Sequence, residues 1–438
     1  MSNPARASWG SKLGLILASA GSAIGLGNLW RFPYIAAENG GGSFLFIYLL
    51  CTFSVGITLL FAESALGVKT KSDPAGAFAW INPHLKFIGT LGVFTSAIIV
   101  PYYSVVGGWI IAYIAKSFCM ADIGNFETHF SEFIASPVSP VLYFYAYMLA
   151  TAAVVYMGIE HGIEKFCKWM MPLLFLLLLV LMLRVLTLEN AWEGVKFFFL
   201  PDFSKITAES WLDAMGQVFF SISVGMGIYI TYGSYVKDDT ISISKTMWPV
   251  AVLDVSVSLL TGLTIFPAVF AFGLPMNAGP SLTFITLPAI FADIPLGTFF
   301  GIVFFVILLG AAITSSISLM EVVTTFLCDQ FKMTRKKAVA AYTALCLVTG
   351  TLVSLSFGKL SGFKIGGKIL FDQFDFLASN ILLPVGGLLT SIAIGWILGP
   401  EKLVVFKNKI LQRCFEFCVK WLAPVSVLAI LLNALGVI

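Results

Sequence analysis

The sequence is poor in charge and in histidine. Charged residues make up 11% of the 438 positions, against about 25% in soluble proteins. The histidines at 84, 129 and 161 form no zinc motif, and no activated nucleophile can be recognised. We therefore do not expect an enzyme. The net charge of +3 is also too small to indicate binding of nucleic acid.

Cysteine pairing is not expected either. The seven cysteines are odd in number and lie almost all in or beside apolar runs, which argues against a disulfide framework. Cys414 and Cys418 are one helical turn apart, but no histidine or further cysteine lies near them in the sequence, so a metal site is not expected there.

The chain is rich in long apolar runs. Apolar residues make up 58% of it, against about 45–50% in soluble proteins, and they fall into runs long enough to cross a bilayer as helices. We predict an all-α polytopic membrane protein that forms one transporter domain over residues 1–438, with the lipid bilayer around it. Eleven transmembrane helices are predicted, at about 12–37, 42–69, 87–118, 138–157, 162–184, 208–237, 244–273, 297–328, 337–357, 367–398 and 412–436.

The orientation follows from the basic residues. Most of the 26 lysines and arginines lie in segments that are cytoplasmic if the N-terminus is inside, and the outer loops at 119–137 and 274–296 then contain none. We therefore predict a cytoplasmic N-terminus. An odd number of spans leaves the C-terminus outside.

The first span is interrupted at its centre. Gly21, Gly25, Gly27 and Asn28 stand where an anchoring helix would have leucines. Unpaired backbone groups cost several kcal/mol each in hydrocarbon, so a broken helix survives only where it lines a cavity or holds a ligand. This stretch is the predicted binding place for the cargo.

The sixth span carries a matching interruption. Ser22 to Gly27 and Ser223 to Gly227 are each a serine followed by Gly-x-Gly. The two stretches are five spans apart, and because five is odd, the second unit has the opposite orientation in the membrane. Paired interruptions of this kind indicate a transporter site. They predict a first repeat at about 12–184, a second at about 208–398 and an additional helix at about 412–436. The alternative is that the glycines only allow close packing of helices.

Asp254 is an acid in the middle of the seventh span. An ionisable group at that depth indicates function, and no basic residue lies near it in its own helix. With Asn28, Ser221 and carbonyls freed by the first break, it would form a site of oxygen ligands that suits sodium. The alternative is a protonated Asp254 that is hydrogen-bonded between helices.

Thr314 and Ser315 lie in the centre of the eighth span, beside small residues. Hydroxyls in membrane helices most often bond back to the carbonyl four residues earlier. Here they would instead form a second cation site against Gly21 and Ile24.

Further charges lie near both ends of the broken helix. Arg31 and Asp375 are expected to form a closing pair at the outer mouth, and Arg6 and Asp329 one at the inner end. The acids Glu63 and Glu321 are expected to accept hydrogen bonds from the unwound backbone of spans six and one.

Several motifs together identify a resemblance. The chain resembles the neurotransmitter:sodium symporter family over essentially its whole length, and its eleven spans and pocket residues are similar to a bacterial sodium-dependent tyrosine or aromatic amino acid transporter. The matching stretches are 14–18 (GLILA), 25–28 (GLGN), 31–33 (RFP), 38–42 (ENGGG), 217–221 (QVFFS), 230–235 (ITYGSY) and 313–317 (ITSSI).

The resemblance implies a fold and a set of site residues. The fold is leucine-transporter-like, with two inverted five-helix repeats, broken helices 1 and 6 and one extra C-terminal helix, in the bacterial inner membrane. The implied first sodium site comprises Ala23, Asn28, Ser221 and Asp254. The implied second sodium site comprises Gly21, Ile24, Ala311, Thr314 and Ser315. The implied substrate-binding residues are Ala23, Leu26, Gly27, Ile99, Tyr103, Phe220, Ser221, Ser223, Met226, Ser315 and Leu319. The implied gates are Arg31, Asp375 and Phe220 outside and Arg6, Asp329, Trp9 and Tyr235 inside.

Two positions depart from the family pattern. Asp254 stands where members usually have asparagine, one helical turn before Ser258. Its carboxylate would supply the negative charge that chloride brings in animal relatives, so no chloride requirement is expected. The region concerned comprises Asp254, Ser258, Gln217 and Tyr48. Met226 stands where the leucine-selective relative has phenylalanine, and a flexible thioether leaves room for a ring and contacts it favourably.

The sequence thus predicts sodium-coupled symport, with two Na+ ions, of a hydrophobic, aromatic (tyrosine-like) L-amino acid into the cell by alternating access. Two alternatives stay open on the same fold. One is a proton-coupled carrier in which Asp254 titrates, and the other is a membrane amino acid sensor that does not transport.

Overall fold

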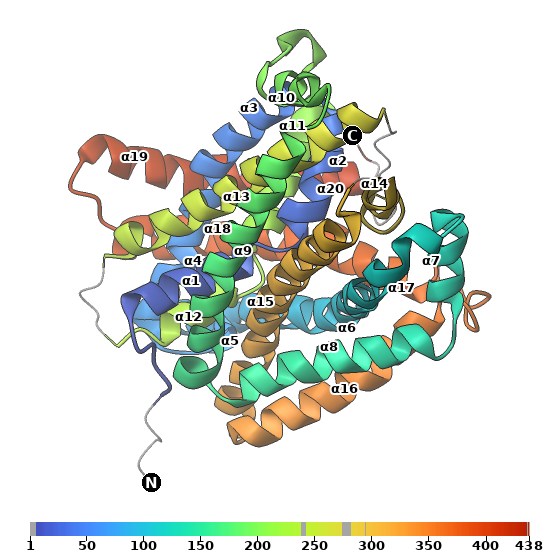
Figure 1. Ribbon diagram of the computed structural model, residues 1–438. Helices are drawn as coiled ribbons and strands as arrows, with labels where there is room; N and C mark the ends of the chain where they lie inside the picture. Colours follow the sequence, from blue (N-terminus) through green and yellow to red (C-terminus); the bar gives the residue numbers. More distant parts are fainter. Residues whose placement is uncertain (1–5, 238–241, 274–281, 294, 436, 438) are drawn as a thin grey trace.

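The computed structural model describes residues 6–237, 242–273, 282–293, 295–435 and 437, and these ranges are helical without a β-strand. Figure 1 shows long helices that cross one another in a single bundle, with short helices on its surface. The predicted all-α class is confirmed.

Nine helices of the described ranges are long and apolar enough to cross a membrane. They are Gly42–Thr70 (α3, η2 and α4), Pro83–Met120 (α6 with its flanking turns), Ser139–Tyr156 (α8), Ile159–Val185 (η5 and α9), Ile243–Phe272 (α13), Gly297–Phe331 (α15), Arg335–Leu355 (α16), Leu370–Leu398 (α17, η8, α18 and η9) and Lys409–Ala434 (α19, η11 and α20).

The first predicted span is a bent pair. α1 covers Lys12–Ala23, and η1 (Gly27–Arg31) with α2 (Phe32–Glu38) continues it at an angle of 46°. Counted as one span, the pair brings the number of candidate spans to ten among the described residues. α11 (Ala208–Ile222) and α12 (Ile228–Ser234) occupy the predicted sixth span but do not pass as one apolar helix. The count of eleven therefore stays a prediction.

Both interruptions lie where the glycine pattern indicated. α1 ends because Ile24 is extended, with φ −76° and ψ 101°. Between α11 and α12, Gly225 and Gly227 have φ of +83° and +75°, a backbone conformation that favours glycine. A Cβ on Gly225 would also lie 3.0 Å from the Gly387 amide nitrogen. The second break thus requires a residue without a side chain.

The two interruptions lie side by side. Ser223 donates a hydrogen bond to the carbonyl of Ser22 over 3.1 Å, although the residues are 201 positions apart. α15 and α6 contact each other along the bundle, α1 packs on α13 and α15, and α12 packs on α4. The unwound segments are therefore enclosed by helices and buried from solvent, as membrane-depth backbone must be.

Short helices cover the ends of the bundle. Four of them are α5 (Pro74–Ile81), α7 (Phe126–Ala135), α10 (Ala191–Phe199) and α14 (Leu287–Asp293). Asp73 caps α5 by accepting from the Ala75 amide, and Asn125 caps α7 by accepting from the Thr128 amide. α10 packs on α13 and α3.

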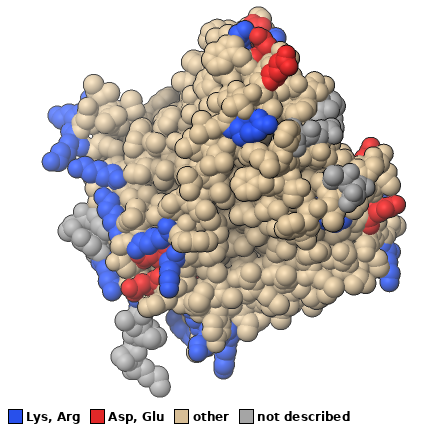
Figure 2. All heavy atoms as spheres, viewed as in Figure 1, with Lys and Arg blue, Asp and Glu red and all other residues tan. Residues whose placement is uncertain are grey.

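Basic side chains are unevenly distributed. Figure 2 shows lysines and arginines gathered mainly on the side from which the N-terminal trace extends, below a broad belt without charge. The positive-inside rule expects such a gathering at the cytoplasmic end, and the orientation of the termini stays a prediction.

Candidate substrate and ion site between the broken helices

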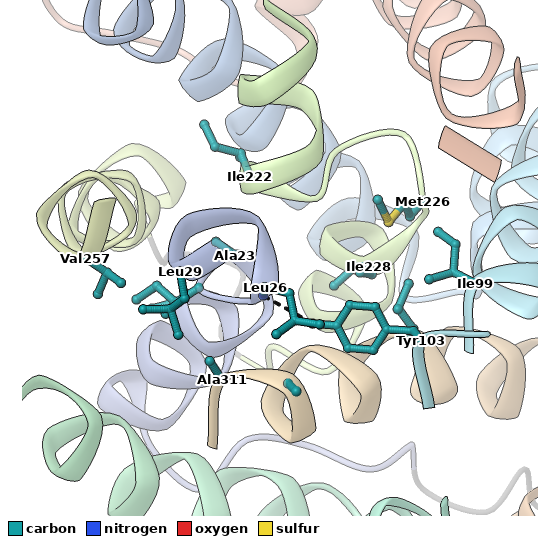
Figure 3. Packing of buried hydrophobic residues seen from close by; sticks show 14 of the residues in the cluster. Ala23, Leu26, Leu29, Ile99, Tyr103, Ile222, Met226, Ile228, Val257 and Ala311 are labelled. Carbon is teal, nitrogen blue, oxygen red and sulfur yellow. Dashed lines mark hydrogen bonds between the residues drawn. The ribbon is translucent and has the colours of Figure 1, made fainter. Parts of the chain in front are cut away.

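A buried cavity lies between the two interruptions and α6 and α15. Its volume is about 30 Å³, room for about two water molecules. In Figure 3, Leu26, Tyr103, Ile99, Met226 and Ile228 converge on this space from different helices. It is lined by Ser22, Ala23, Gly25, Leu26, Gly27, Ile99, Tyr103, Phe220, Ser223, Met226, Ile228, Ser315 and Leu319.

The implied substrate-binding set is brought together here, with one exception. Ser221 does not line the cavity; its hydroxyl donates instead to Asp254 Oδ1 over 2.8 Å. Ser22 and Gly25 also line the cavity; they belong to the stretch predicted to bind the cargo, although they were not named among the substrate-binding residues. Ile228 was not identified from the sequence, and only its place directly after the second break could have indicated it.

The cavity has a polar end and an apolar end. At the polar end the amide of Leu26 donates to the Tyr103 hydroxyl over 3.4 Å. Backbone amides and a hydroxyl at a helix break are the groups that bind a carboxylate. Ile99, Met226 and Leu319 supply the apolar wall. An amino acid fits only after these walls move apart, because the cavity is smaller than such a molecule.

Ser22 is distinctive among the lining residues. Its carbonyl accepts hydrogen bonds from Ser223 and from Ser315, over 3.1 and 3.2 Å. Its own hydroxyl is buried and has no hydrogen-bond partner among the described residues. Within that part of the chain, the cavity wall therefore holds an unpaired hydroxyl at the first break.

Asp254 lies at the centre of a polar cluster. Asn28 Nδ2 donates to Asp254 Oδ1 over 2.7 Å and to the hydroxyls of Ser221 and Ser258 over 2.9 Å each. The Asn28 oxygen accepts from the Gly25 amide over 3.1 Å. One amide nitrogen is thus surrounded by carboxylate and hydroxyl oxygens, which are hard ligands for a cation.

Of the residues expected to replace chloride, Tyr48 and Ser258 belong to this cluster and Gln217 does not. The Tyr48 hydroxyl donates to Asp254 Oδ2 over 3.2 Å and lies 3.3 Å from the Ser258 hydroxyl. Gln217 points elsewhere, because its Nε2 donates to the carbonyl of Gly27 over 2.9 Å. A negative charge on Asp254 is therefore held by donors from η1, α3 and α11.

The residues of the implied second sodium site also meet. The Ser315 hydroxyl lies 3.4 Å from the carbonyl of Gly21 and 3.5 Å from that of Ile24. The Thr314 hydroxyl donates to the carbonyl of Ala311 over 3.0 Å. The Ser315 hydroxyl thus faces carbonyls of α1, whereas the Thr314 hydroxyl bonds back within α15 and also lies 3.1 Å from the Gly310 carbonyl. These hydroxyl and carbonyl oxygens are of the kind that binds sodium.

The outer gate residues are separated. The Arg31 guanidinium lies 5.1 Å from the centre of the Phe220 ring and is 3.4 Å from the Gly216 carbonyl. No ion pair joins it to Asp375 within the described ranges; Asp375 accepts from the Ser379 hydroxyl over 3.0 Å. A cavity of about 160 Å³ lies here, lined by both Arg31 and Ser379. Phe220 lines this cavity and the inner one, and so separates them.

The inner gate residues are in contact. Arg6 Nη1 lies 2.7 Å from Asp329 Oδ2, and the Asp73 amide donates to the same oxygen over 2.9 Å. Trp9 Nε1 donates to the carbonyl of Tyr232 over 2.9 Å. The Arg6 guanidinium also lies 5.3 Å from the centre of the Tyr235 ring. The first residues of the described chain therefore close the inner end over α12.

The two further acids behave differently. Glu63 accepts from the Gly225 amide over 2.7 Å, so it bonds to the unwound backbone as expected. Glu321 does not: it pairs with Arg335 and accepts from the Tyr235 hydroxyl over 2.6 Å. The expectation for Glu321 was wrong, because Arg335 of the next long helix, α16, forms an ion pair with its carboxylate.

Comparison with known proteins agrees with this geometry. The model of the sodium:neurotransmitter symporter family matches residues 6–123 and 129–437. An uncharacterized sodium-dependent transporter of Bacillus subtilis, YhdH, is 37% identical over the full length of both chains. Another of Haemophilus influenzae is 32% identical over 99% of each chain.

A solved structure extends the likeness to the fold. The crystal structure of MhsT in complex with L-phenylalanine is 38% identical, superposes with a TM-score of 0.88 and covers 98% of this chain and 100% of that one. These relatives are transporters rather than enzymes. The broken helices, the enclosed cavity and the matches along the whole length have one common explanation: the chain belongs to the sodium:neurotransmitter symporter family.

Proposed function

We propose that the protein imports a hydrophobic, aromatic L-amino acid together with sodium. The observation that carries the proposal is the cavity between the two breaks, with amide and hydroxyl groups at one end and Ile99, Met226 and Leu319 at the other. Such a pocket is complementary to a zwitterion with an apolar side chain.

The aromatic preference is supported by the adaptability of the wall. Met226 has no branched carbon, and its sulfur contacts aromatic rings favourably. MhsT, a relative of the same fold, is solved with L-phenylalanine bound. Tyrosine, tryptophan and phenylalanine are therefore the first substrates to test, with large aliphatic amino acids next.

Two sodium ions are proposed. The first would bind at Asn28, Ser221, Asp254 and the Ala23 carbonyl, and the substrate carboxylate would complete its ligands. The second would bind between α1 and α15 at Thr314 and Ser315. Coupling follows because each ligand set is incomplete without the other, so substrate and ion raise one another's affinity. Chloride is not required in this proposal, because Asp254 carries the negative charge.

Alternating access would proceed by relative rocking of two groups of helices. The contacts of Arg6 with Asp329, and the separation of Arg31 from Asp375, support a state that is closed at the inner end. Closure of the outer pair above Phe220 would follow substrate binding. The division into two inverted repeats, with the N-terminus inside and the C-terminus outside a bacterial inner membrane, belongs to the same proposal.

Counterflow and uptake in proteoliposomes test the function. Labelled tyrosine, phenylalanine, tryptophan and leucine are offered under an imposed sodium gradient, and separately under a proton gradient without sodium. We expect accumulation only with sodium, and more strongly for an aromatic substrate. Accumulation driven by protons alone would support a proton-coupled carrier, and binding without flux would support a sensor.

A further inference from the structure

An apolar groove lies on the surface between α4 (Ile57–Thr70), the start of α13 and α19 (Lys409–Phe417). Its volume is about 500 Å³. Its walls include Ile57 and Phe61 of α4, Trp248 and Pro249 of α13, and Leu411 and Phe415 of α19. We call it the α19 groove. None of its lining residues belongs to the candidate substrate and ion site.

α19 is amphipathic. Leu411, Cys414 and Phe415 face the groove, while Lys409 and Arg413 on the same helix are exposed and make no side-chain hydrogen bond or ion pair in the described part of the chain. In Figure 1 the helix projects at the edge of the bundle. α19 begins the candidate span Lys409–Ala434, and basic residues at the end of a span favour an anionic leaflet surface.

Among the described residues that line the groove, Lys245 is the one that carries a charge. It is exposed and has no side-chain partner among the residues that the structure describes. It lies in the first turn of α13, and the N-cap residue Ser242 makes no side-chain capping hydrogen bond. A lysine and the positive end of a helix dipole together favour an anion. The adjacent Ser244 also lines the groove and adds a hydroxyl.

The groove also has the length and the aromatic lining of a lipid site. On η2 (Thr52–Gly56) and α4 it extends from Phe53 to Phe61, or about 12 Å of helix, close to the ~15 Å of hydrocarbon in one leaflet. Phe53 and Trp248 are both exposed, with ring centres 5.5 Å apart.

We propose that the α19 groove binds an anionic phospholipid, with an acyl chain between α4 and α19 and the phosphate on Lys245 and the first turn of α13. The occupant follows from charge complementarity at one end of a groove that is otherwise apolar. A zwitterionic lipid carries its own cation and gains less from Lys245. This site is independent of the amino acid and of sodium.

Native mass spectrometry of the full chain tests the proposal. Protein released from mixed phosphatidylglycerol and phosphatidylcholine micelles is expected to retain phosphatidylglycerol preferentially. Lys245→Gln should lower that retention about fivefold, the effect of roughly 1 kcal/mol per basic residue near an anionic lipid. Lys337→Gln, which removes an exposed lysine outside the groove, should leave retention unchanged.

A second variant separates the acyl chain from the headgroup. Cys414→Phe fills the groove without altering its charge, and should reduce the retention of phosphatidylglycerol although Lys245 is present. Thermal shift with inorganic phosphate provides the headgroup-only comparison and should show no stabilisation. Equal retention by Lys245→Gln and the unmutated protein would overturn the proposal. So would equal retention of both lipids, or stabilisation by phosphate alone.

Discussion

At the scale of single residues, Asp254 is the most informative position. Its carboxylate is fully buried and accepts from Asn28, Tyr48 and Ser221, three side chains from three other helices. Truncating one partner of a buried charge network leaves the others unsatisfied, which costs more than the contact itself. A substitution of Asp254 is therefore expected to affect both the proposed ion site and the stability of the fold.

Asp254→Asn is expected to create dependence on chloride. The substitution keeps the shape of the side chain but removes the charge, so sodium-driven uptake in chloride-free buffer should fall about tenfold or more, as one lost charged contact of at least ~1.5 kcal/mol predicts. Added chloride should restore part of it. Uptake is measured in both buffers. Ser256→Ala removes a hydroxyl that bonds to the carbonyl of Val252 in its own helix; it serves as the control and should behave as the unmutated protein. Undiminished chloride-free uptake by Asp254→Asn would contradict the proposed replacement of chloride by the Asp254 carboxylate.

At the scale of elements, the shape of the second break depends on glycine. Gly225 combines a φ of +83° with close approach to the backbone of α18 (Leu383–Ile392). Its amide is also the donor to Glu63. The break is thus held open by a hydrogen bond from α4 as well as by its own conformation.

Gly225→Ala should destabilise the protein by about 1–3 kcal/mol, the range for a strained backbone position. The added Cβ would meet Gly387 and Leu383, so the loss should appear as a lower melting temperature and weaker substrate binding. Gly216→Ala in α11 is the matched control, because a Cβ there meets nothing within 4 Å. It should leave stability unchanged or raise it by up to about 1 kcal/mol. Equal effects of the two substitutions would argue against a requirement for glycine at the break.

A second element, the start of α1, depends on Glu164. The side chain of Glu164 is 3% exposed and pairs with Lys168 over 2.6 Å. It accepts from the Gly10 amide and the Ser11 hydroxyl over 2.7 and 2.8 Å. One carboxylate of η5 (Ile159–Glu164) therefore ties the N-terminal segment to α9.

Glu164→Gln should loosen that segment. Hydrogen bonds to a charged group contribute about 1.5–3 kcal/mol each, so amide exchange near Gly10 and Gly14 should become faster. The readout is hydrogen–deuterium exchange of the N-terminal peptide. Glu160→Gln, in the same η5 but exposed, is the comparison and should leave exchange as it is. Unchanged exchange in Glu164→Gln would show that Arg6 and Trp9 hold the segment without help.

At the scale of the whole molecule, closure of the inner end links α1, α5 and α15. Asp73 lies beside this contact: its Oδ1 accepts from Gln330 Nε2 over 2.7 Å and its Oδ2 caps α5. Burial raises the pKa of the Asp73 carboxyl above its usual value, and the neighbouring Asp329 raises it further, against the lowering by Gln330.

This pKa shift predicts that the inner-closed form gains stability as the pH falls. When it is ionised, a carboxyl with a raised pKa destabilises the closed form. This destabilisation is complete above the raised pKa, and it is lost as the pH falls from there towards the usual pKa near ~4. Asp73→Asn imitates the neutral side chain and keeps the cap, so it should favour closure at all pH values. Cys328 lines a separate cavity at the inner end of the bundle, together with Arg6 and Asp329, and its labelling is mapped by mass spectrometry. The intrinsic pH dependence of thiol labelling, which follows the thiolate fraction, is measured on the unfolded protein and divided out. After this correction we expect slower labelling at lower pH in the unmutated protein, and uniformly slow labelling in Asp73→Asn. Identical pH profiles would contradict the role of Asp73.

Much of this molecule was accessible from its sequence. The low charge and long apolar runs determined the class, because hydrocarbon admits only helices or closed barrels. The two serine–Gly-x-Gly stretches determined where helices would break, since glycine pattern and hydropathy are local properties. Asp254, Thr314 and Ser315 were identified because polar groups at membrane depth are costly.

Only the tertiary structure decided which of these groups meet. The Ser223–Ser22 contact joins breaks 201 residues apart, and Ser221 faces Asp254 rather than the cavity. The closed inner pair, the separated outer pair, and the partner of Glu321 depend on the relative positions of whole helices. The groove under α19 depends on them as well. Local sequence sets the conformation and chemistry of each segment, whereas contacts between distant segments arise only when the bundle assembles.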